Sequence, residues 1–304
     1  MLTTMTFKRN IIFLLLLGII PLTSTAQRWK KYRMEVGGGI GPSFFLCDVG
    51  GYKDVPSNNI SDINFKSTRM AMGGNFSYFL RQDMAVNASL GYAMLTAKDE
   101  FAANEARRNR NFNIRTHAFE LAINYRYFFI KDKFGHAFRL RGTKAPILSA
   151  ISSYVTLGVG ALYFNPTGLH SDGKYYALQP LGTEGQGLPG GPDKYKRLSL
   201  VVPIGVGARF AVTSQLSVGA EFNARVTFTD YLDDVSTVYY DNKSISDAYG
   251  EKAGYLADPN DGTNPTWTGA GERRGGEKNK DFYGTFMFTA NYKILKGKSF
   301  KPRF

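Results

Sequence analysis

The sequence predicts an all-β fold, namely an antiparallel transmembrane β-barrel of about eight strands with long extracellular loops and mostly short periplasmic turns. Three observations predict it: long segments alternate apolar and polar residues, a leader-like segment precedes them, and long connections alternate with short ones. A soluble strand has about 5–6 residues, whereas a tilted strand that crosses a membrane needs about 9–11. Strand length therefore favours a membrane barrel.

The clearest predicted strand is Leu216–Phe228. Its alternate residues from Leu216 onward are apolar, whereas the residues between them are polar or small and include Glu221 and Arg225. Alternation with a period of two gives a strand one apolar and one polar face. A strand of this length with charged residues on its inner face is typical of a transmembrane barrel.

The N-terminal segment predicts export. Lys8-Arg9 precede an apolar run, Ile11–Ile20, and the small residues Ser24–Ala26 follow. This order is typical of a secretory signal peptide, and the run is too short to cross a bilayer as a helix. We expect cleavage after Ala26, so that residues 1–26 are the signal peptide and 27–32 form a short periplasmic segment.

Composition limits the classes of partner. The formal net charge of +13 falls to about +11 (13 − 2) when Lys8 and Arg9 are removed, and the remaining cations are scattered. We therefore expect outer-membrane lipid, lipopolysaccharide phosphates or an acidic protein as partners, and no nucleic acid. The single cysteine, Cys47, lies beyond the cleavage region, so we expect no N-terminal lipid anchor and no internal disulfide.

The remaining strands follow the same alternation. The eight predicted strands are Arg33–Leu46, Phe65–Leu80, Met84–Met94, Thr116–Phe129, Ser152–Asn165, Leu198–Phe210, Leu216–Phe228 and Phe282–Ile294. Together they give a barrel over residues 33–295, followed by a basic tail over 296–304. A soluble β-sandwich is the competing fold, but its strands would be shorter and its interior face apolar.

Loop lengths predict the topology. Long connections follow the first, third, fifth and seventh strands, whereas Arg81–Asp83 and Thr213–Ser214 are tight turns. Outer-membrane barrels have short periplasmic turns and long outer loops. We therefore expect an integral outer-membrane protein with both termini in the periplasm. Lys131–Ala150 is an exception, because it is a long connection on the periplasmic side.

Several charged residues have the inward parity of their strands: Glu120, Arg126, Arg209, Glu221 and Arg225. An eight-stranded barrel is narrow, and side chains fill its interior. We interpret these residues as a network of lumen salt bridges that plugs the barrel. A solute channel, the alternative, would need more strands or a missing plug.

Enzyme and metal functions have little support in the sequence. His117, His136 and His170 have no Ser or Asp partner at a recognisable spacing, so we predict no catalytic residue, no enzyme activity and no cofactor. Asp230, Asp233 and Asp234 have oxygen ligands for a divalent cation, but their spacing is not that of an EF-hand. A solvated loop start, or pairing with Arg273 and Arg274, is the simpler interpretation.

One segment resembles a known family. The strand that contains Glu221 and Arg225 runs through Thr227 and Thr229 into Asp230, Tyr231, Leu232, Asp233, Asp234, Val235 and Ser236. This segment, preceded by Val202–Gly207, resembles the PorG-like outer-membrane barrels of Bacteroidota, which are associated with type IX protein secretion. The resemblance covers Val201–Tyr240 well and most of the mature chain loosely.

The resemblance implies an eight-stranded barrel that anchors the periplasmic ring of the type IX system, a lipoprotein and its ring partner, to the outer membrane. The basic segments Lys131–Ala150 and Lys296–Arg303 would face that ring. A second hypothesis is a generic structural or adhesion barrel that binds ligands through its outer loops, among them Asp230–Lys280.

Overall fold

The computed structural model describes residue 30 and residues 32–50, 65–102, 104–131, 150–260, 262–276 and 280–295. The predicted signal peptide (1–26), nearly all of the predicted 27–32 segment, the interior of the 131–150 connection and the basic tail over 296–304 lie outside the described residues.

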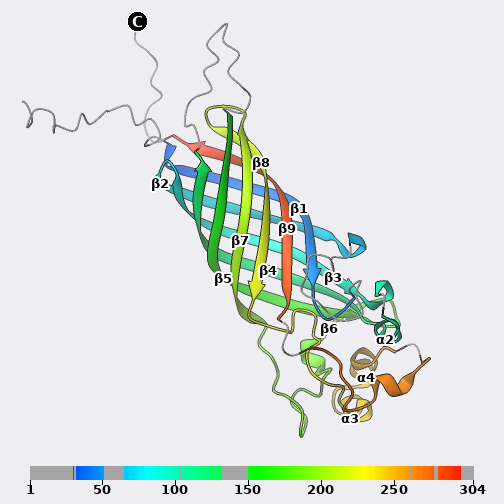
Figure 1. The fold of residues 1–304 in the computed structure, drawn as a ribbon. Coiled ribbons are helices and arrows are strands. Elements are labelled where there is room, and N and C mark those ends of the chain that lie inside the picture. The colour runs from blue at the N-terminus through cyan, green and yellow to red at the C-terminus, as the bar shows by residue number, and fades with distance from the viewer. Residues whose placement is uncertain are drawn as a thin grey trace, which may run out of the picture.

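The fold is a closed antiparallel β-barrel of eight strands (Figure 1). The barrel strands are β1 (Met34–Leu46), β2 (Arg69–Arg81), β3 (Met84–Lys98), β4 (Asn113–Ile130), β5 (Ile151–Leu169), β7 (Leu198–Ala211), β8 (Leu216–Thr227) and β9 (Phe282–Ile294). Each pairs with its neighbours in the chain, and β1 pairs with β9 to close the sheet. A short additional strand, β6 (Tyr175–Ala177), pairs with the end of β5. The predicted fold class is confirmed.

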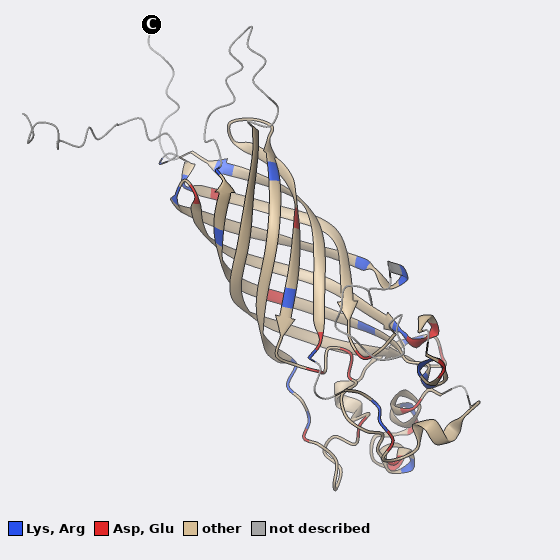
Figure 2. Cartoon of the chain, viewed as in Figure 1, with Lys and Arg blue, Asp and Glu red and all other residues tan. Residues whose placement is uncertain are grey.

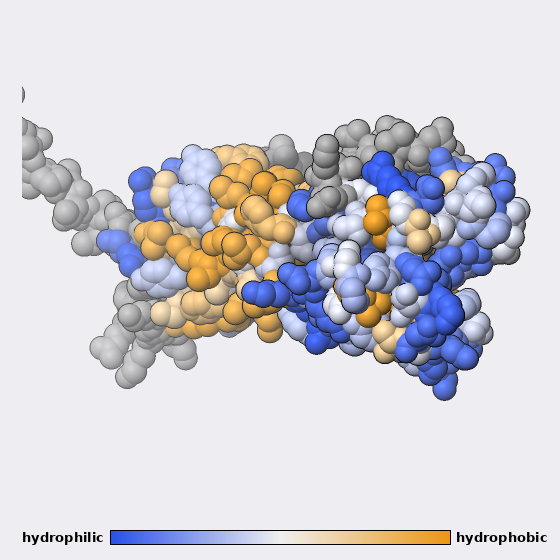
Figure 3. Space-filling model, turned by 90° about the horizontal axis from the view of Figure 1, so that it is seen from below, coloured by the Kyte–Doolittle hydropathy of each residue, from blue (hydrophilic) through white to orange (hydrophobic). Residues whose placement is uncertain are grey.

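The outside of the barrel is apolar where a soluble protein would be polar. Leu121 and Ile123 of β4 are 62% and 63% exposed, and Leu198 of β7 is 63% exposed. Hydrophobic residues cover the barrel surface in Figure 3, whereas hydrophilic residues gather at the end that bears the helices. An apolar exterior on a closed sheet, with every strand paired, is the arrangement that lipid requires. This exterior makes the chain a transmembrane β-barrel of the outer-membrane type.

The two ends of the barrel differ. The turn between β2 and β3 at Gln82–Asp83 and the turn between β7 and β8 at Val212–Gln215 are at one end, together with the start of β1 and the end of β9 (Figure 1). The long connections are at the other end. The sequence-based prediction that the first end faces the periplasm and the second the cell exterior rests on the usual orientation of such barrels and stays a prediction.

The outer connections are more ordered than the sequence suggested. They contain α2 (Glu105–Arg110), α3 (Asn242–Tyr249) and α4 (Glu251–Ala257), with 3-10 helices η3 (Phe65–Ser67), η4 (Asp99–Phe101), η6 (Gln179–Leu181) and η7 (Pro265–Thr268). Asp241 caps α3 by accepting from the Ser244 N–H, and Gly250, at φ 92°, makes the junction to α4. No helix in the described part of the chain is long and apolar enough to cross a membrane. We call this outer assembly, which comprises residues 47–50, 99–112, 170–197 and 229–281 where described, the cap.

The strand assignment gives a first prediction. Ile123 lies midway along β4 on the lipid face, so Ile123→Arg places a charge near the bilayer midplane. We expect a loss of about 2–4 kcal/mol in the free energy of unfolding, measured by urea titration in lipid vesicles. Leu198→Arg, at the outer rim, is the control and should cost at most about 1 kcal/mol. Equal losses at the two positions would contradict the proposed membrane depth.

Candidate functional site

The barrel interior holds buried ion pairs at successive levels. Figure 2 shows charged residues on the otherwise tan barrel strands and a larger number in the cap. Near the middle, Arg126 of β4 pairs with Glu221 of β8, with Nη2 3.1 Å from Oε2. The Tyr154 hydroxyl also donates to Glu221, and Asn223 donates to its second oxygen at 2.6 Å. These contacts satisfy both oxygens of Glu221, which removal from water requires.

A second pair lies nearer the cap. Arg225 of β8 donates through Nε to Glu120 of β4 at 3.1 Å, and the Tyr283 hydroxyl donates to the same carboxylate oxygen at 2.7 Å. Arg225 also donates to the Thr285 hydroxyl. The pair spans the lumen from one wall to the other, since β4 and β8 are not neighbours in the sheet. These four residues therefore cross-brace the barrel.

The third pair includes a residue that sequence reasoning missed. Arg209 of β7, a predicted lumen residue, donates to Glu35 of β1 at 2.7 Å, and both side chains are buried. The Arg209 guanidinium also stacks near the Phe128 ring, with a distance of 4.6 Å to the centroid. Glu35 has the inward parity of β1, so the alternation of Met34 and Val36 could have identified it. All five predicted lumen residues, Glu120, Arg126, Arg209, Glu221 and Arg225, thus have ion-pair partners in the lumen.

These pairs leave little free space in the barrel. A cavity of about 80 Å³ remains, lined by small residues such as Gly73, Ser89 and Gly91 on one side and by Arg126 and Glu221 on the other. Since one water molecule occupies about 30 Å³ of liquid, this volume holds only two or three waters. At these levels the ion pairs and their hydrogen-bond partners occupy much of the described lumen.

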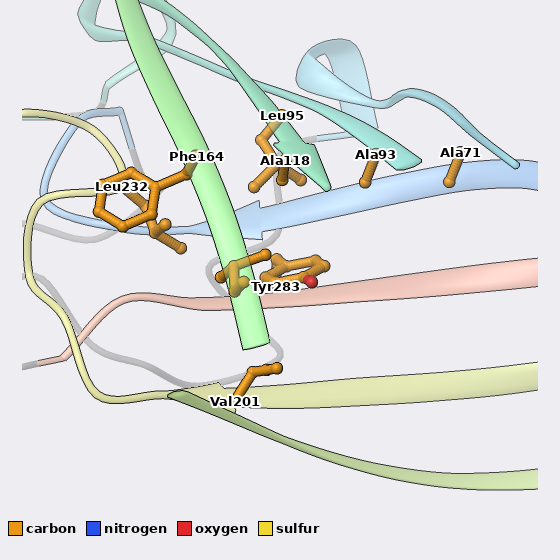
Figure 4. Close-up of a cluster of buried hydrophobic side chains, with 9 residues drawn as sticks. Ala71, Ala93, Leu95, Ala118, Phe164, Val201, Leu232 and Tyr283 are labelled. Atoms are coloured by element: carbon orange, nitrogen blue, oxygen red, sulfur yellow. The ribbon is translucent and has the colours of Figure 1, made fainter. Parts of the chain in front are cut away.

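The segment that carries the family resemblance closes the outer mouth of the barrel. Leu232 has no exposed surface and packs with Phe164 of β5, Val201 of β7 and Tyr283 of β9 (Figure 4). The Thr116 hydroxyl donates to the Leu232 carbonyl. The Tyr231 ring stacks on Tyr195 at 4.4 Å between centroids. Residues 230–236 therefore form a plug, the part of the cap that lies over the lumen.

The aspartates of this plug are buried, which corrects the expectation of a solvated loop start. Asp233 accepts the backbone N–H groups of Asp48 and Val235, each at 3.0 Å. Asp234 accepts the hydroxyls of Thr183 and Tyr195, and Asp230 accepts the Ser236 hydroxyl at 2.7 Å. Asp234 adopts φ 64°, a left-handed conformation that aspartate tolerates better than most residues. Asp233 and Asp234 thus bond to other parts of the cap, whereas Asp230 bonds within the plug.

Arg274 links the plug to the other loops. Its Nη1 donates to Glu184 Oε1 at 3.0 Å and to the Asp234 carbonyl, and both charged side chains are fully buried. Glu184 also accepts the N–H groups of Ser236 and Thr237. The suggested pairing with Arg274 is therefore present, with Nη2 3.8 Å from Asp234 Oδ2. Glu184, in a Gly-rich loop, was not identified from sequence because its partners are about 50 and 90 residues away.

Burial changes the proton affinity of the cap carboxyls. It raises the pKa of Asp230 to about 7 and that of Asp234 to about 6, with Arg274 opposing the effect at Asp234. Burial also raises the pKa of Asp233 and that of Asp281; repulsion by Asp48 raises the pKa of Asp233 further, and repulsion by Asp233 raises that of Asp281 further. The folded cap therefore favours protonated carboxyls more than the unfolded chain does.

The described side chains do not form a metal centre or a recognisable catalytic group. Within the described ranges, no three His, Cys, Asp or Glu side chains converge to hold a metal ion. His117 contacts the Tyr92 hydroxyl at 2.8 Å, and His170 is 3.2 Å from Asp172. Neither of these contacts includes a Ser or Cys nucleophile. His136 lies outside the described residues.

Comparisons with known proteins give similar structures but no family. No family model matches the chain, and no curated protein matches it. Solved structures that match include the attachment invasion locus protein Ail of Yersinia pestis (10% identity, TM-score 0.35, covering 86% of this chain and 98% of that one). A major outer membrane protein from Thermus thermophilus (10%, 0.36, 85% and 98%) and the outer membrane enzyme PagL (13%, 0.29, 86% and 99%) also match. Likenesses this distant assign no activity to the chain.

The lumen pairs give a second prediction. Arg225→Met leaves the Glu120 charge buried without its partner, and we expect a loss of about 3–5 kcal/mol in the free energy of unfolding. Adding Glu120→Gln should recover much of that loss, because the buried charge is then absent. Urea unfolding in vesicles gives both values as a double-mutant cycle. Lys243→Met, in the exposed Lys243–Asp247 pair, is the control and should change little.

The cap carboxyls give a third prediction, which concerns pH. Because the folded-state pKa of Asp230 is above its unfolded value of 3.8, the stability that its proton contributes is lost as the pH rises from about 4 through about 7. Hydrogen exchange should therefore show cap protection factors at least about tenfold lower at pH 8 than at pH 5. Asp230→Asn, which can still accept from Ser236, should raise protection at pH 8 and reduce this dependence. Equal protection at the two pH values in the unmodified protein would refute the assignment.

Proposed function

We propose that this chain is a non-enzymatic outer-membrane barrel that anchors the periplasmic ring complex of a type IX secretion system. The observation that supports a non-enzymatic structural barrel is its filled interior. Ion pairs lie across the lumen, and residues 230–236 plug the mouth of the barrel at the cap end. A barrel whose interior is filled in this way would act through its surfaces, as an anchor or a binding scaffold. The resemblance of Val201–Tyr240 to PorG-like barrels supports the more specific role.

The buried plug explains why such a motif would characterise a family. Its residues bond to Thr116 of β4, to Asp48 beyond β1, to Glu184 and Arg274 in the cap, and to Asp281 before β9. A motif with this many long-range contacts specifies a particular cap on a particular barrel. It does not itself form the partner surface, because its side chains are mostly buried. The ring proteins would instead contact the predicted periplasmic end. The predicted contact segments, residues 131–150 and 296–304, lie almost entirely outside the described residues.

A second candidate function, binding through the cap, has an observation of its own. Trp267 of η7 and Tyr255 of α4 are 42% and 37% exposed on the ordered cap. Exposed aromatic residues on a rigid surface are common in protein-binding sites. An adhesion or envelope-binding role would use this surface, whereas periplasmic anchoring would not.

A pull-down experiment separates the two roles and is the fourth prediction. The tagged protein is purified from detergent-solubilised outer membranes of its native cells, and co-purifying proteins are identified. Anchoring predicts recovery of the ring lipoprotein and its partner, with a large loss of both when residues 132–149 are replaced by a tight turn.

The matched control for that experiment is the cap variant Tyr255→Ala/Trp267→Ala, which alters only exposed side chains. Under anchoring, ring recovery and type IX secretion should not change in this variant. If the ring proteins never co-purify, the anchoring role is wrong. If the cap variant then also loses adhesion to cells or envelope ligands, the second function is supported.

A further inference from the structure

The cap contains a cavity that is lined mainly by arginines. Its volume is about 170 Å³, and its lining residues are Asp48, Asn104, Arg107, Arg110, Arg273, Arg274 and Gly275. Arg107 and Arg110 come from α2, and Arg273 and Arg274 come from the segment before β9. At about 30 Å³ for each water, the volume equals five or six waters, which is enough for an oxyanion the size of phosphate.

Two of these arginines are held rigidly. Arg110 donates Nε and Nη2 to the two oxygens of Asp99, at 2.8 and 3.0 Å, and Nη1 to the Arg274 carbonyl at 2.6 Å. Arg274 is held by Glu184 and by the Asp234 carbonyl. Fixed guanidinium groups lose little conformational freedom when they bind an anion, so the site is organised in advance.

One donor in the cavity wall has no acceptor among the described residues. Arg274 is 1% exposed, and its Nη2 makes no hydrogen bond; Asp234 Oδ2 lies 3.8 Å from it, beyond hydrogen-bond distance. A buried charged donor without an acceptor is costly. A structural salt bridge with Glu184 accounts for Nη1 of Arg274, but it leaves Nη2 without an acceptor.

The positive charge that the cavity presents comes from Arg107 and Arg273, and Arg273 connects the cavity to solvent. Arg273 is exposed, and its backbone segment is brought in by Gly275, where a Cβ would lie 2.6 Å from the Ser236 nitrogen. Asp48 is the one carboxylate among the lining residues, and its Oδ2 accepts the Gly276 N–H. Arg110, Arg107 and Arg273 all act electrostatically on Asp48. Asp99 pairs with Arg110 and Glu184 pairs with Arg274, so the charges that remain at the cavity are those of Arg107 and Arg273 against that of Asp48.

We propose that this cavity is an extracellular binding site for a tetrahedral oxyanion, a phosphate group above all. Arg274 Nη2 and Arg273 would donate to the phosphate oxygens, and Arg107 would add positive charge. The same chemistry suits a free phosphomonoester and the phosphate of a lipopolysaccharide headgroup. This inference does not depend on the role in secretion, because it concerns the opposite end of the barrel.

Isothermal titration of the full-length mature protein in lipid nanodiscs with inorganic phosphate tests the site. We expect saturable binding that weakens as the salt concentration rises. Arg273→Gln, at an exposed position, should weaken it roughly tenfold, since about 1.4 kcal/mol corresponds to a factor of ten. Asp48→Asn should tighten it by removing the opposing charge, provided that the Gly276 contact is kept. Arg108→Gln, exposed on the same helix but outside the lining, is the matched control and should have no effect.

Absence of binding, or equal binding by Arg273→Gln and the Arg108→Gln control, would overturn the proposal. A thermal unfolding scan of each variant ensures that a loss of binding is not a loss of fold. Nanodiscs with lipopolysaccharide, before and after enzymatic dephosphorylation, distinguish the two sources. If only phosphorylated lipopolysaccharide competes with inorganic phosphate, the ligand is the lipid headgroup. If phosphate binds equally well in nanodiscs with phosphorylated and with dephosphorylated lipopolysaccharide, the ligand is a soluble phosphate compound.

Discussion

The pairing of β1 with β9 is the constraint on which the rest of the structure depends. In a bilayer no water is present to satisfy an open edge, so the sheet must close on itself. Closure with eight strands fixes a narrow interior, and that interior must be filled. The register of β1 against β9, from Met34 opposite Ile294 to Leu46 opposite Phe282, also brings the two ends of the barrel sequence together. The cap segments that leave β1 and enter β9 are therefore adjacent once the sheet has closed.

The narrow interior explains why charges fill the lumen. A charge that enters this space loses water, and only a partner with the right geometry compensates for the loss. Arg126 with Glu221, Arg225 with Glu120 and Arg209 with Glu35 meet that condition across the barrel. Such pairs contribute less to stability than hydrophobic packing would. They do fix which strand faces which across the lumen, because a shifted register would leave a charge without its partner.

Much of this fold could be predicted from the sequence, because alternation is a local signal. Each long strand repeats with a period of two, and the predicted strand Leu216–Phe228 ends within one residue of β8. Parity alone placed Glu221 and Arg225 inside. Glu35 escaped notice because the glycines that follow it weaken the alternation in β1. The predictions of strand number and topology depended on many weak local signals that agreed with one another.

The cap could not be predicted in the same way, because its order comes from contacts between distant residues. The helices α3 and α4 have 8 and 7 residues, which is too short for a clear periodic pattern. The carboxylates of the plug looked like a solvated acidic loop, since the residues that bury them, such as Glu184 and Arg274, are about 50 and 40 residues away. A charge in a loop reveals its burial only when its partners are known.

The same long-range contacts have a consequence for the order in which the molecule assembles. The Asp48 N–H donates to Asp233, 185 residues away, and the Gly276 N–H donates to Asp48, 228 residues away. Contacts between residues this distant in the chain form late, because every intervening loop must close first. The cap can therefore be completed only after the last strand has joined the first. An ordered cap on the cell surface would thus report that insertion of the barrel below it has finished.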